Sequence, residues 1–517
     1  MRHRWIFALM ACVAACAGDG GSRGPAGTAV IASVAEPSSL VPPLIYDAAS
    51  RDLADLVYER LATLAPGGAS IDSTAYRPAL AQRWERIDSV SWRFQLRPDA
   101  RWHDGTPVTA ADVVFSFQLY ADSIIDALAR DQVAGRITAV AEDSATIRLT
   151  FARNRPEQFY DATQHVRILP RHVWEPMGPS ALLADTALSH LVGSGPYRVA
   201  AWRHGESLEL RADTLRPVDR RAGLERVVVR FAGDPGAAVN LLLSHEADLM
   251  ETLVSSQDAD RVASDSTFRL DQHPSVVYGF LAFKVADDRG RPHPTLGSRD
   301  VRRALAMAVD RQAVATNAFG TGVEVPAGPV SAMSWIGSDG IKQLGLDTAA
   351  AALALRGRQL KFDILVPGTS PSRVQIAQAL QEMWRRAGAE VTVTRVDFPV
   401  FQERLAAGRF DSYIGAYLDE PSLRGLEEQW GTAGWDQVNY GRWSLPAFDS
   451  LLAQAAATGD TGVAGPLYRQ ALSLLNQDAP AIFLYNPVAR SAISRRLDHV
   501  TINPYAWLAT LPEWSVE

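Results

Sequence analysis

The chain has 517 residues, of which 47% are hydrophobic and 8% aromatic, and this suits a globular protein of about three domains. Charged residues make up 21%, and 51 basic against 58 acidic residues give a formal net charge of −7. The chain has neither the basic excess typical of nucleic-acid-binding proteins nor an acidic low-complexity tail, so the composition argues against nucleic acid as a partner.

The first twenty residues have the pattern of an export signal. Arg2 and Arg4 precede a short apolar segment that ends in small residues before a cysteine and is too short to span a bilayer. The tetrapeptide VAAC, ending at Cys16, resembles a bacterial lipobox, in which cleavage leaves a lipid-carrying cysteine as the first residue. We therefore expect a signal peptide over 1–15, lipid on Cys16, and an exported protein held at a membrane by this anchor alone.

A second lipobox match, LMAC, ends at Cys12 but leaves a very short apolar core, so Cys16 is preferred; ordinary secretion with a free cysteine is the remaining alternative. Both cysteines of the chain lie in this segment, so the mature protein would have no disulfide framework. Residues 16–27 read as a flexible glycine-rich tether. The anchored protein would lie at the outer face of the cytoplasmic membrane, or in the periplasm or at the outer membrane.

From about residue 28 the chain alternates strand-like and helix-like segments, which indicates an α/β protein. SWRFQLRPDARW and LERVVVRFAGD predict strands, and SRDVRRALAMAVDRQAV predicts an amphipathic helix with Ser298 as its N-cap. LKFDILVP, a helix from about Ser372 to Gly388, and EVTVTRV form a predicted compact α/β unit. The last thirty or so residues look irregular.

The stretch WHDGTPVTAAD contains adjacent His103 and Asp104, a pair that raises the possibility of acid–base chemistry or a metal site. Adjacent side chains on an extended segment point to opposite faces and are poorly placed to share one proton or one metal. Asp-Gly is a turn dipeptide, and Thr109 with Asp112 matches a capping box. We therefore predict a tight turn and a capped helix start.

Nucleophilic catalysis and metal binding have weak signals in this sequence. Ser194 in VGSGPY lacks the spacing of a nucleophile elbow, and the glycines around it lack the lysine of a phosphate loop, so a tight turn is expected. The histidines are scattered and no pair shows helical ligand spacing beside a carboxylate. We expect no catalytic residue, no metal ligand and no cofactor. The histidines weighed are His165, His172, His204, His245 and His273.

The stretch WRFQLRPDARWHDGTPVTAADVVFSF resembles the signature of the extracellular solute-binding proteins of the oligopeptide, dipeptide and nickel family, family 5, which serve ABC importers. Five further blocks resemble family blocks in family order: ILPRHVWE, VGSGPYRV, LLLSHEADL, DVRRALAMAVDR and LPAFDSLLAQA. The chain is thereby identified as a member. The resemblance implies an α/β, two-lobed periplasmic-binding-protein-like fold of class II type with an inserted subdomain.

The resemblance also implies how the chain is divided. Lobe I would be discontinuous, over 28–60, 192–275 and 487–517, with an inserted subdomain over 61–191. Lobe II would cover 276–486.

Ligand contacts are implied by the same resemblance. In peptide-binding relatives a carboxylate on the loop after the corresponding strand pairs with the terminal ammonium of the ligand, and the candidates here are Asp419 and its neighbour Glu420. A cation enclosed in a closed cleft loses water and requires such an opposite charge. Tyr417, Trp435 and Tyr440 surround this loop and offer a rigid aromatic wall, with a core role as the alternative.

In the first lobe, LVYERLATLAP resembles a block that lines the cleft, so Tyr58 and Glu59 are further candidates. Two positions depart from the family pattern: Arg60 stands where glycine is frequent, and Lys284 stands where asparagine is frequent.

The resemblance implies a monomeric, lipid-anchored binding protein that closes its lobes over an oligopeptide or dipeptide and delivers it to the transmembrane subunits of an ABC permease. An extended peptide suits such a cleft because the cleft can form hydrogen bonds with the peptide backbone whatever side chains the peptide carries. A nickel chelate or another small solute is the alternative ligand. An exported hydrolase or metalloenzyme is the alternative of a different class.

Overall fold

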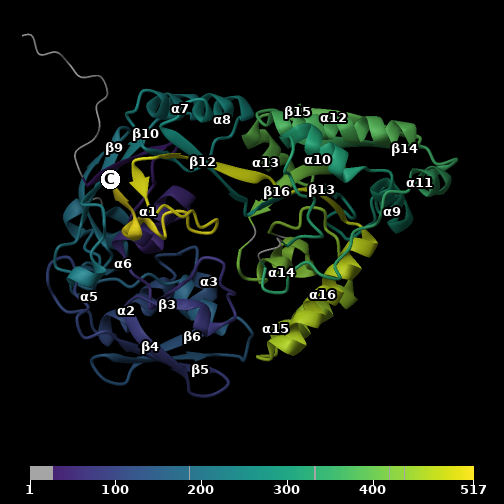
Figure 1. Ribbon diagram of the computed structural model, residues 1–517. Helices are drawn as coiled ribbons and strands as arrows, with labels where there is room; N and C mark the ends of the chain where they lie inside the picture. Colours follow the sequence, from purple (N-terminus) through teal and green to yellow (C-terminus); the bar gives the residue numbers. More distant parts are fainter. Residues whose placement is uncertain (1–26, 186, 331–333, 419, 436, 517) are drawn as a thin grey trace, which may run out of the picture.

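The computed structural model describes residues 27–185, 187–330, 334–418, 420–435 and 437–516. The predicted signal peptide and Cys16 lie outside the described residues. The chain forms two lobes, and the first carries an additional subdomain (Figure 1). The two-lobed α/β architecture expected from the sequence is confirmed.

Lobe I is built on a seven-stranded mixed sheet whose strands come from three separate stretches of the chain. In sheet order the strands are β12 (Phe268–Pro274), β18 (Val488–Ser494), β11 (Leu249–Met250), β1 (Thr28–Ser33), β10 (Arg226–Phe231), β9 (Ser207–Ala212) and β8 (Tyr197–Arg203). The central strand β1 is parallel to β10 and β11, and the other neighbours are antiparallel.

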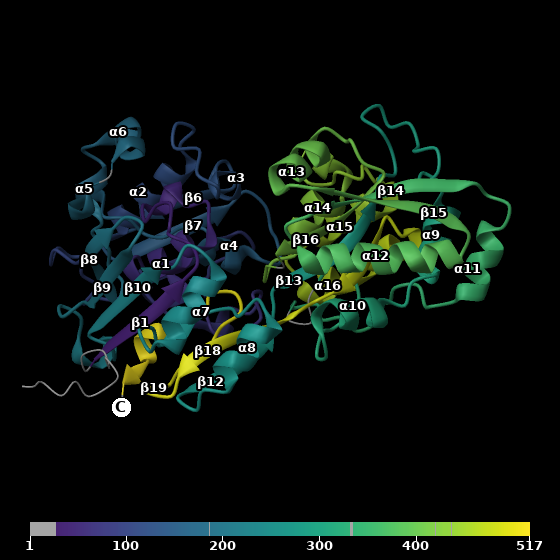
Figure 2. The ribbon, with the colours of Figure 1, turned by 90° about the horizontal axis from the view of Figure 1, so that it is seen from above.

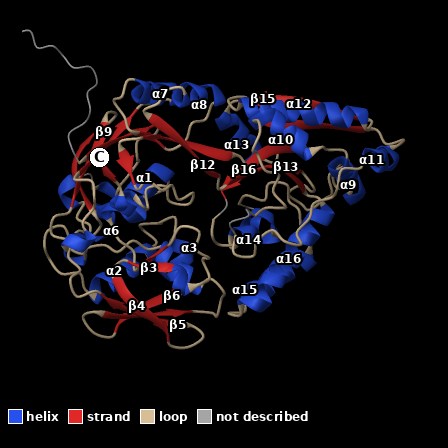
Figure 3. Ribbon diagram, in the orientation of Figure 1, coloured by secondary structure: helices blue, strands red, loops and turns tan. Residues whose placement is uncertain are grey.

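Helices cover both faces of this sheet (Figure 3): α1 (Ala48–Val57) on one face, α7 (Pro235–Leu243) and α8 (Ser256–Ala263) on the other. Alternate side chains of β1 point to opposite faces, so Ala29 and Ile31 pack on the α1 side and Ala32 packs on the α7 and α8 side. A central strand covered on both faces needs apolar side chains on both, which explains the apolar run AVIA in the middle of TAVIAS.

The expectation of an irregular C-terminal stretch is correct for most of residues 495–516 but wrong for the segment before them. Residues Val488–Ser494 form β18, which pairs with β12 along its whole length and with β11 on its other side. The sequence VARSAIS alternates only weakly, and it is the pairing on both sides that makes it a strand. Two short strands then pair near the C-terminus, β19 (Leu497–Asp498) and β20 (Ser515–Val516).

The inserted subdomain is centred on a four-stranded antiparallel sheet. In sheet order its strands are β4 (Ala81–Arg86), β5 (Ser91–Leu96), β7 (Thr146–Phe151) and β6 (Ile137–Ala141), and β2 (Ala62–Leu64) pairs separately with β3 (Tyr76–Pro78). Its helices are α2 (Ala110–Ala121), α3 (Arg130–Val133), α4 (Gln158–Gln164), α5 (Arg171–Trp174) and α6 (Gly178–Ala184).

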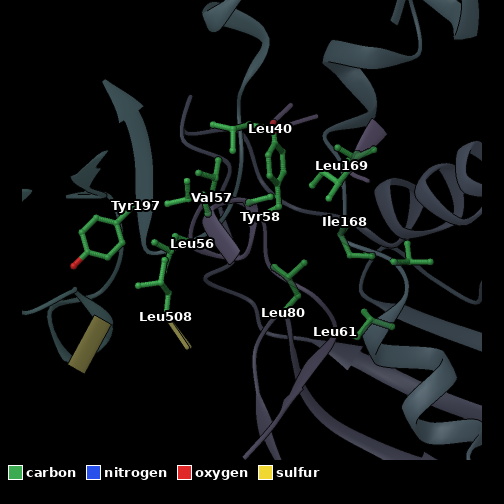
Figure 4. Close-up of a cluster of buried hydrophobic side chains, with 14 of the residues drawn as sticks. Leu40, Leu56, Val57, Tyr58, Leu61, Leu80, Ile168, Leu169, Tyr197 and Leu508 are labelled. Carbon is green, nitrogen blue, oxygen red and sulfur yellow. The ribbon is translucent and has the colours of Figure 1, made fainter. Parts of the chain in front are cut away.

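One continuous hydrophobic core joins the subdomain to lobe I. Figure 4 shows Leu80 and Ile168 of the subdomain next to Tyr58 of lobe I, and all three are buried in one hydrophobic cluster. Because separating the two parts would expose this shared apolar surface, we treat them as one rigid unit.

The WHDG stretch is a structural turn, as predicted. Gly105 has φ +89, a left-handed conformation that favours glycine, and the Asp104 carboxylate accepts a hydrogen bond from the backbone N–H of Thr106 at 2.9 Å. At the start of α2 the Asp112 carboxylate accepts from the N–H and the hydroxyl of Thr109, at 2.8 and 2.7 Å, so the capping box is confirmed.

His103 connects this turn to the GSG segment of the chain. Its Nδ1 accepts a hydrogen bond from the N–H of Gly193 at 3.1 Å, and its Nε2 lies 3.0 Å from the carbonyl oxygen of Gly195. Burial lowers the pKa of His103, and a neutral ring with the proton on Nε2 satisfies both contacts. A Cβ on Gly193 would lie 1.8 Å from the carbonyl oxygen of Val57, so only glycine allows this approach.

Lobe II is built on a five-stranded mixed sheet. In sheet order its strands are β15 (Ala389–Val396), β14 (Leu360–Pro367), β16 (Ser412–Leu418), β13 (Val277–Phe283) and β17 (Ala481–Tyr485). Its helices are α9 (Arg299–Met307), α10 (Arg311–Phe319), α11 (Thr348–Leu355), α12 (Pro371–Arg386), α13 (Phe398–Ala406), α14 (Gly425–Trp430), α15 (Pro446–Ala456) and α16 (Thr461–Asp478). Short 3-10 helices of both lobes are η1 (Pro42–Leu44), η2 (Ser73–Ala75), η3 (Leu188–His190), η4 (Val218–Arg220), η5 (Thr432–Gly434) and η6 (Leu511–Glu513).

The predicted β–α–β unit of lobe II is confirmed as β14, α12 and β15, with β14 and β15 parallel. The predicted amphipathic helix after Ser298 is divided in two. Helix α9 ends at Met307, and Asp310 caps α10 by accepting a hydrogen bond from the N–H of Ala313 at 3.0 Å. The Asp310 side chain binds a backbone N–H that a continuous helix would use, so it starts a new helix at this point. The spacing of the apolar residues does not show this interruption.

The main chain passes between lobe I and lobe II at two places, between β12 and β13 and between β17 and β18 (Figure 2). The side chain of Asn486, in the second passage, donates hydrogen bonds to the carbonyl oxygens of Ser275 and Val277 in the first, at 2.9 and 2.7 Å. The backbone adds a bond from the N–H of Ser275 to the carbonyl oxygen of Pro487 at 3.1 Å. Two adjacent, cross-linked passages are the geometry of a hinge.

No helix in the described part of the chain is both long enough and apolar enough to cross a membrane.

Candidate functional site

The subdomain and lobe II contact each other through the buried side chain of Glu157, which directly precedes α4. One carboxylate oxygen accepts the hydroxyl of Ser422 at 2.7 Å. The other accepts the backbone N–H of Leu423 at 2.9 Å and the indole N–H of Trp335 at 2.9 Å. Burial raises the pKa of Glu157, and the hydrogen bonds from Ser422 and Leu423 partly oppose this shift. All three donors belong to lobe II, so the carboxylate joins the two lobes.

The loop after β16 makes further contacts with the subdomain. The guanidinium of Arg424 pairs with Asp161 at 3.3 Å and donates to the side-chain oxygen of Gln132. The hydroxyl of Ser70 donates to the carbonyl oxygen of Pro421 at 2.6 Å. In Figure 1 this loop lies between β16 and α14 and faces the subdomain. The loop is therefore an interlobe contact of lobe II.

Two adjacent cavities lie at this interlobe contact. The larger has a volume of about 320 Å³ and is formed by the start of β6, the segment after β7 and Arg424 of lobe II. The smaller, of about 90 Å³, extends along lobe II towards Tyr468 and the acidic side chains Glu427 and Glu428. Because both lobes supply walls, the shape of both cavities depends on the relative position of the lobes.

The larger cavity is lined by the four arginines Arg136, Arg153, Arg155 and Arg424, with Asp161 as the acidic member. Arg424 is already paired with Asp161. Within the described ranges, the other three arginine side chains form no ion pair. Arg136, Arg155 and Arg424 also line the smaller cavity together with four acidic side chains, so the positive charge is balanced across the two cavities.

Arg155 is the half-buried member of this group, whereas Arg136 and Arg153 are exposed. Burial lowers the pKa of Arg155; the charge of Arg424 lowers it further, Asp161 raises it, and Arg136 lowers it. A guanidinium stays protonated in proteins, so the shift expresses an electrostatic cost that a nearby anion would relieve.

The three aromatic candidates lie in lobe II and are engaged in packing. Tyr417, on β16, donates its hydroxyl to the carbonyl oxygen of Val438 at 2.7 Å, and its ring centroid lies 4.8 Å from that of Phe280. The indole of Trp435 donates to the carbonyl oxygen of Trp443 at 2.8 Å. The ring of Tyr440 meets that of Tyr413 edge-on, with 6.2 Å between centroids. All three are half-buried, and none lines either cavity.

Asp419 lies outside the described residues, and its neighbour Glu420 is exposed. Glu420 begins the interlobe segment that continues to Arg424. Burial raises the pKa of Tyr160 and of Glu428, and the charge of Glu420 adds to both shifts. The described part of this loop thus lies at the contact between the lobes, where it contacts side chains of the subdomain.

Tyr58 and Glu59 are enclosed, in contrast to the expectation that they face a ligand. Tyr58 has 1% of its surface exposed and packs in the core shared by lobe I and the subdomain. The Glu59 carboxylate accepts hydrogen bonds from Arg97 at 2.8 Å and from Arg216 at 3.1 Å. A buried carboxylate needs such partners, and here they connect lobe I to the subdomain, so the surroundings of both residues indicate structural roles.

The part of the chain that the structure describes contains no group of three or more histidine, cysteine, aspartate or glutamate residues placed to hold a metal ion. His172 pairs with Asp104 at 2.7 Å, and His204 lies 2.8 Å from Glu36.

Comparison with known proteins places this architecture in a family. A model of the bacterial extracellular solute-binding proteins, family 5, matches residues 75–424, which is more than half of the chain. The chain belongs to this family. It is therefore an exported solute-binding protein and not an enzyme, as the sequence blocks predicted.

Several known binding proteins are similar to this chain over most of their length. The periplasmic murein peptide-binding protein MppA of Escherichia coli is 25% identical over 445 residues, covering 79% of each chain. A crystal structure of the ABC transporter substrate-binding protein CtaP of Listeria monocytogenes has a TM-score of 0.84 at 20% identity and covers 96% of this chain and 100% of its own. The oligopeptide-binding protein AppA of Bacillus subtilis, in complex with a nonapeptide, has a TM-score of 0.76 at 18% identity and covers 95% and 99%.

The sequence did not single out Glu157 or the arginines of the larger cavity. Arg153 and Arg155 stand in the polar segment FARNRPEQF after β7, and exposed arginines are ordinary on protein surfaces. The one feature of the sequence that could have indicated these arginines is the cluster of charged residues directly after the buried strand β7. Only the approach of lobe II, which adds Arg424, shows that these side chains share a cavity.

Proposed function

We propose that the chain is the extracytoplasmic component of an ABC importer that captures an oligopeptide or dipeptide between its lobes and delivers it to the permease. The supporting observation is the combination of a two-passage hinge with an interlobe contact made by polar side chains of both lobes. A ligand that contacts both lobes favours their closed arrangement, and closure marks the loaded protein for the transporter. The peptide-binding names of MppA and AppA support the ligand class.

Within this function we propose that the loop after β16 serves the cationic end of the ligand through Asp419 and Glu420. The half-buried rings of Tyr417, Trp435 and Tyr440 would support that loop as a rigid wall. We further propose a monomer anchored through lipid on Cys16, because the tetrapeptide VAAC that ends at Cys16 resembles a bacterial lipobox, and a lipid chain holds an exported protein at a membrane surface.

Native mass spectrometry of the purified protein tests this function. We expect the protein to carry co-purified masses that denaturation releases and fragmentation assigns to peptides. Masses that contain nickel or another metal would replace the peptide by a chelate as the ligand. Asp419→Asn should weaken binding of the identified peptide, and an unchanged affinity would show that the proposed ammonium contact is wrong.

The anchor is tested separately by mass spectrometry of the N-terminal peptide from membranes of producing cells. Lipid on Cys16 is expected, and Cys16→Ser should release the protein from the membrane fraction. Lipid on Cys12, or an unmodified N-terminal segment, would contradict this part of the proposal.

A further inference from the structure

The carboxylate of Glu157 is buried at the contact between the lobes and is held by uncharged partners only. The residue is 7% exposed. The groups that donate to it are the hydroxyl of Ser422, the backbone N–H of Leu423 and the indole N–H of Trp335. Within the described ranges, no arginine, lysine or histidine side chain forms an ion pair with it. A carboxylate in such surroundings has lost water without gaining an opposite charge.

The charged groups near Glu157 do not favour its ionised form. Three arginines and three other acidic side chains line the smaller cavity with it, so these charges cancel in number. Burial raises the pKa of Glu157, and the charge of Asp161 on the same helix adds to the shift. Burial also raises the pKa of three tyrosines that lie close enough to feel the charge of Glu157, so they stay neutral. The charged groups are Arg136, Arg155, Arg424, Asp161, Glu427 and Glu428, and the tyrosines are Tyr76, Tyr160 and Tyr468.

The hydroxyl of Ser422 allows the interlobe contact to persist when Glu157 gains a proton. A serine hydroxyl can donate or accept a hydrogen bond. It donates to the ionised carboxylate at 2.7 Å, and it can accept from the protonated carboxyl group across the same distance. The other carboxyl oxygen continues to accept from Leu423 and Trp335. Protonation therefore removes the cost of burying a charge and breaks none of these bonds.

Separation of the lobes changes the surroundings of Glu157. Its three hydrogen-bond donors and part of the wall of the smaller cavity belong to lobe II. When lobe II moves away, water replaces these partners, and a glutamate in water has its ordinary pKa of about 4.5. Because the group binds its proton more tightly when it is buried, closure of the lobes takes up a proton.

We infer that Glu157 is a proton-linked positioning residue, whose protonation favours the closed arrangement of the lobes and whose ionisation weakens it. The inference rests on the proposed function, because it describes how retention of a ligand between the lobes is regulated. The contribution of the proton to closure is fully present below about pH 4.5 and is lost as the pH rises through the higher pKa of the closed arrangement. An acidic medium thus favours capture, and a rise in pH favours release.

The first test measures closure in the absence of any ligand. Dyes on Ser89→Cys and Ala453→Cys, in a protein that lacks its two native cysteines, report the distance between subdomain and lobe II by energy transfer. The closed population of the parent should increase as the pH is lowered from 8 to 4.5. Glu157→Gln keeps the size of the side chain and its bond to Ser422 but carries no charge, so it should remove this pH dependence and stay closed at pH 8.

Two variants serve as controls in the same assay. Glu175→Gln makes the same change of charge at an exposed glutamate of the subdomain. His165→Gln removes the histidine that pairs with Asp161 at 3.2 Å. Both should keep the pH dependence of the parent. Circular dichroism confirms that each variant folds. The inference is overturned if closure of the parent does not depend on pH, if folded Glu157→Gln keeps the dependence, or if His165→Gln removes it.

The second test counts the protons taken up when a mixed pentapeptide library binds, by calorimetry at pH 6 in buffers of different ionisation enthalpy. The parent and Glu175→Gln should take up a fraction of a proton that Glu157→Gln does not. Equal uptake by all three proteins overturns the inference but leaves the peptide function intact. If no peptide binds, the peptide function fails, and the closure assay without ligand still decides the role of Glu157.

Discussion

Glu157 and Ser422 are separated by 265 positions in the chain, yet the Glu157 carboxylate accepts a 2.7 Å hydrogen bond from the Ser422 hydroxyl. One residue belongs to the inserted subdomain and the other to lobe II. Together with the bonds from Leu423 and Trp335, this contact closes one side of the interlobe space. The loop in which the sequence placed a ligand contact therefore also holds the lobes together.

Glu157→Ala is predicted to destabilise the contact between the lobes. The change leaves the N–H of Leu423 and the indole of Trp335 without their acceptor, at a cost of about 1.5–3 kcal/mol for lost bonds to a charged group. The equilibrium constant between the arrangement with the lobes in contact and the separated arrangement should fall by roughly tenfold or more. Single-molecule energy transfer between dyes on Ser89→Cys and Ala453→Cys measures the distance between subdomain and lobe II.

The control for this experiment is Glu175→Ala, since Glu175 forms an exposed pair with Arg171 within the subdomain. It should leave the distance distribution unchanged. If Glu157→Ala also leaves it unchanged in a folded protein, the buried carboxylate does not set the position of the lobes.

Asn486→Ala is predicted to loosen the hinge. The amide of Asn486 links the two chain passages by bonds to Ser275 and Val277, and its removal leaves two carbonyl oxygens unpartnered, at roughly 1–3 kcal/mol. Backbone amides at 274–277 and 486–488 should exchange with deuterium faster. Asn317→Ala, on the exposed surface of α10, should leave exchange in both passages unchanged. Unaltered exchange in the Asn486 variant would show that backbone pairing alone maintains the hinge.

Glu59→Ala tests whether this residue is structural. Arg97 has a side chain only 3% exposed, and removing Glu59 leaves it with only the more exposed Asp99, 3.6 Å away, as an ion-pair partner, so the cost should approach the about 3–5 kcal/mol typical of a broken buried pair. Urea denaturation should show this loss of unfolding free energy, while the affinity of the folded variant for its ligand stays within about twofold of the parent. Glu85→Ala breaks an exposed pair with Arg93 and should cost about 1 kcal/mol or less. A stable Glu59 variant with lost affinity would restore Glu59 as a ligand contact.

The stability of lobe I should fall as the pH rises, because of Asp52 on α1. Burial raises the pKa of Asp52 from 3.8 to about 7; Arg51 opposes this shift and Glu251 adds to it. The folded state thus binds the proton more tightly than the unfolded chain, so the contribution of this group is present below about pH 4 and is lost as the pH rises to about 7, a change of up to about 4 kcal/mol.

Asp52→Asn removes this titration, since the amide stays neutral. The variant should be more stable than the parent at pH 8 and nearly equal to it at pH 4, in denaturant titrations at both pH values. The exposed Asp131 provides the control, because Asp131→Asn should change stability little at either pH. If the difference in unfolding free energy between the Asp52→Asn variant and the parent is the same at pH 4 and pH 8, the pKa of Asp52 is not raised.

The sequence by itself determined the local structure around WHDG, the β–α–β unit of lobe II and the family. These depend on neighbours within a few residues or on ordered blocks along the chain: Thr109 and Asp112 are three apart, and their capping bonds need no distant partner. The strand β18 escaped prediction because its structure comes from pairing with β11 and β12, more than two hundred positions earlier.

Only the tertiary structure decided which polar residues meet between the lobes. Arg155 and Arg424 line one cavity although they are 269 positions apart in the chain, and Glu59 is enclosed because Arg97 and Arg216 reach it from other segments. A charged side chain has the same local preferences whether it faces solvent, a salt bridge or a ligand. Its role depends on which charges the fold brings within a few ångströms, because electrostatic energy and desolvation are set by those distances and by burial.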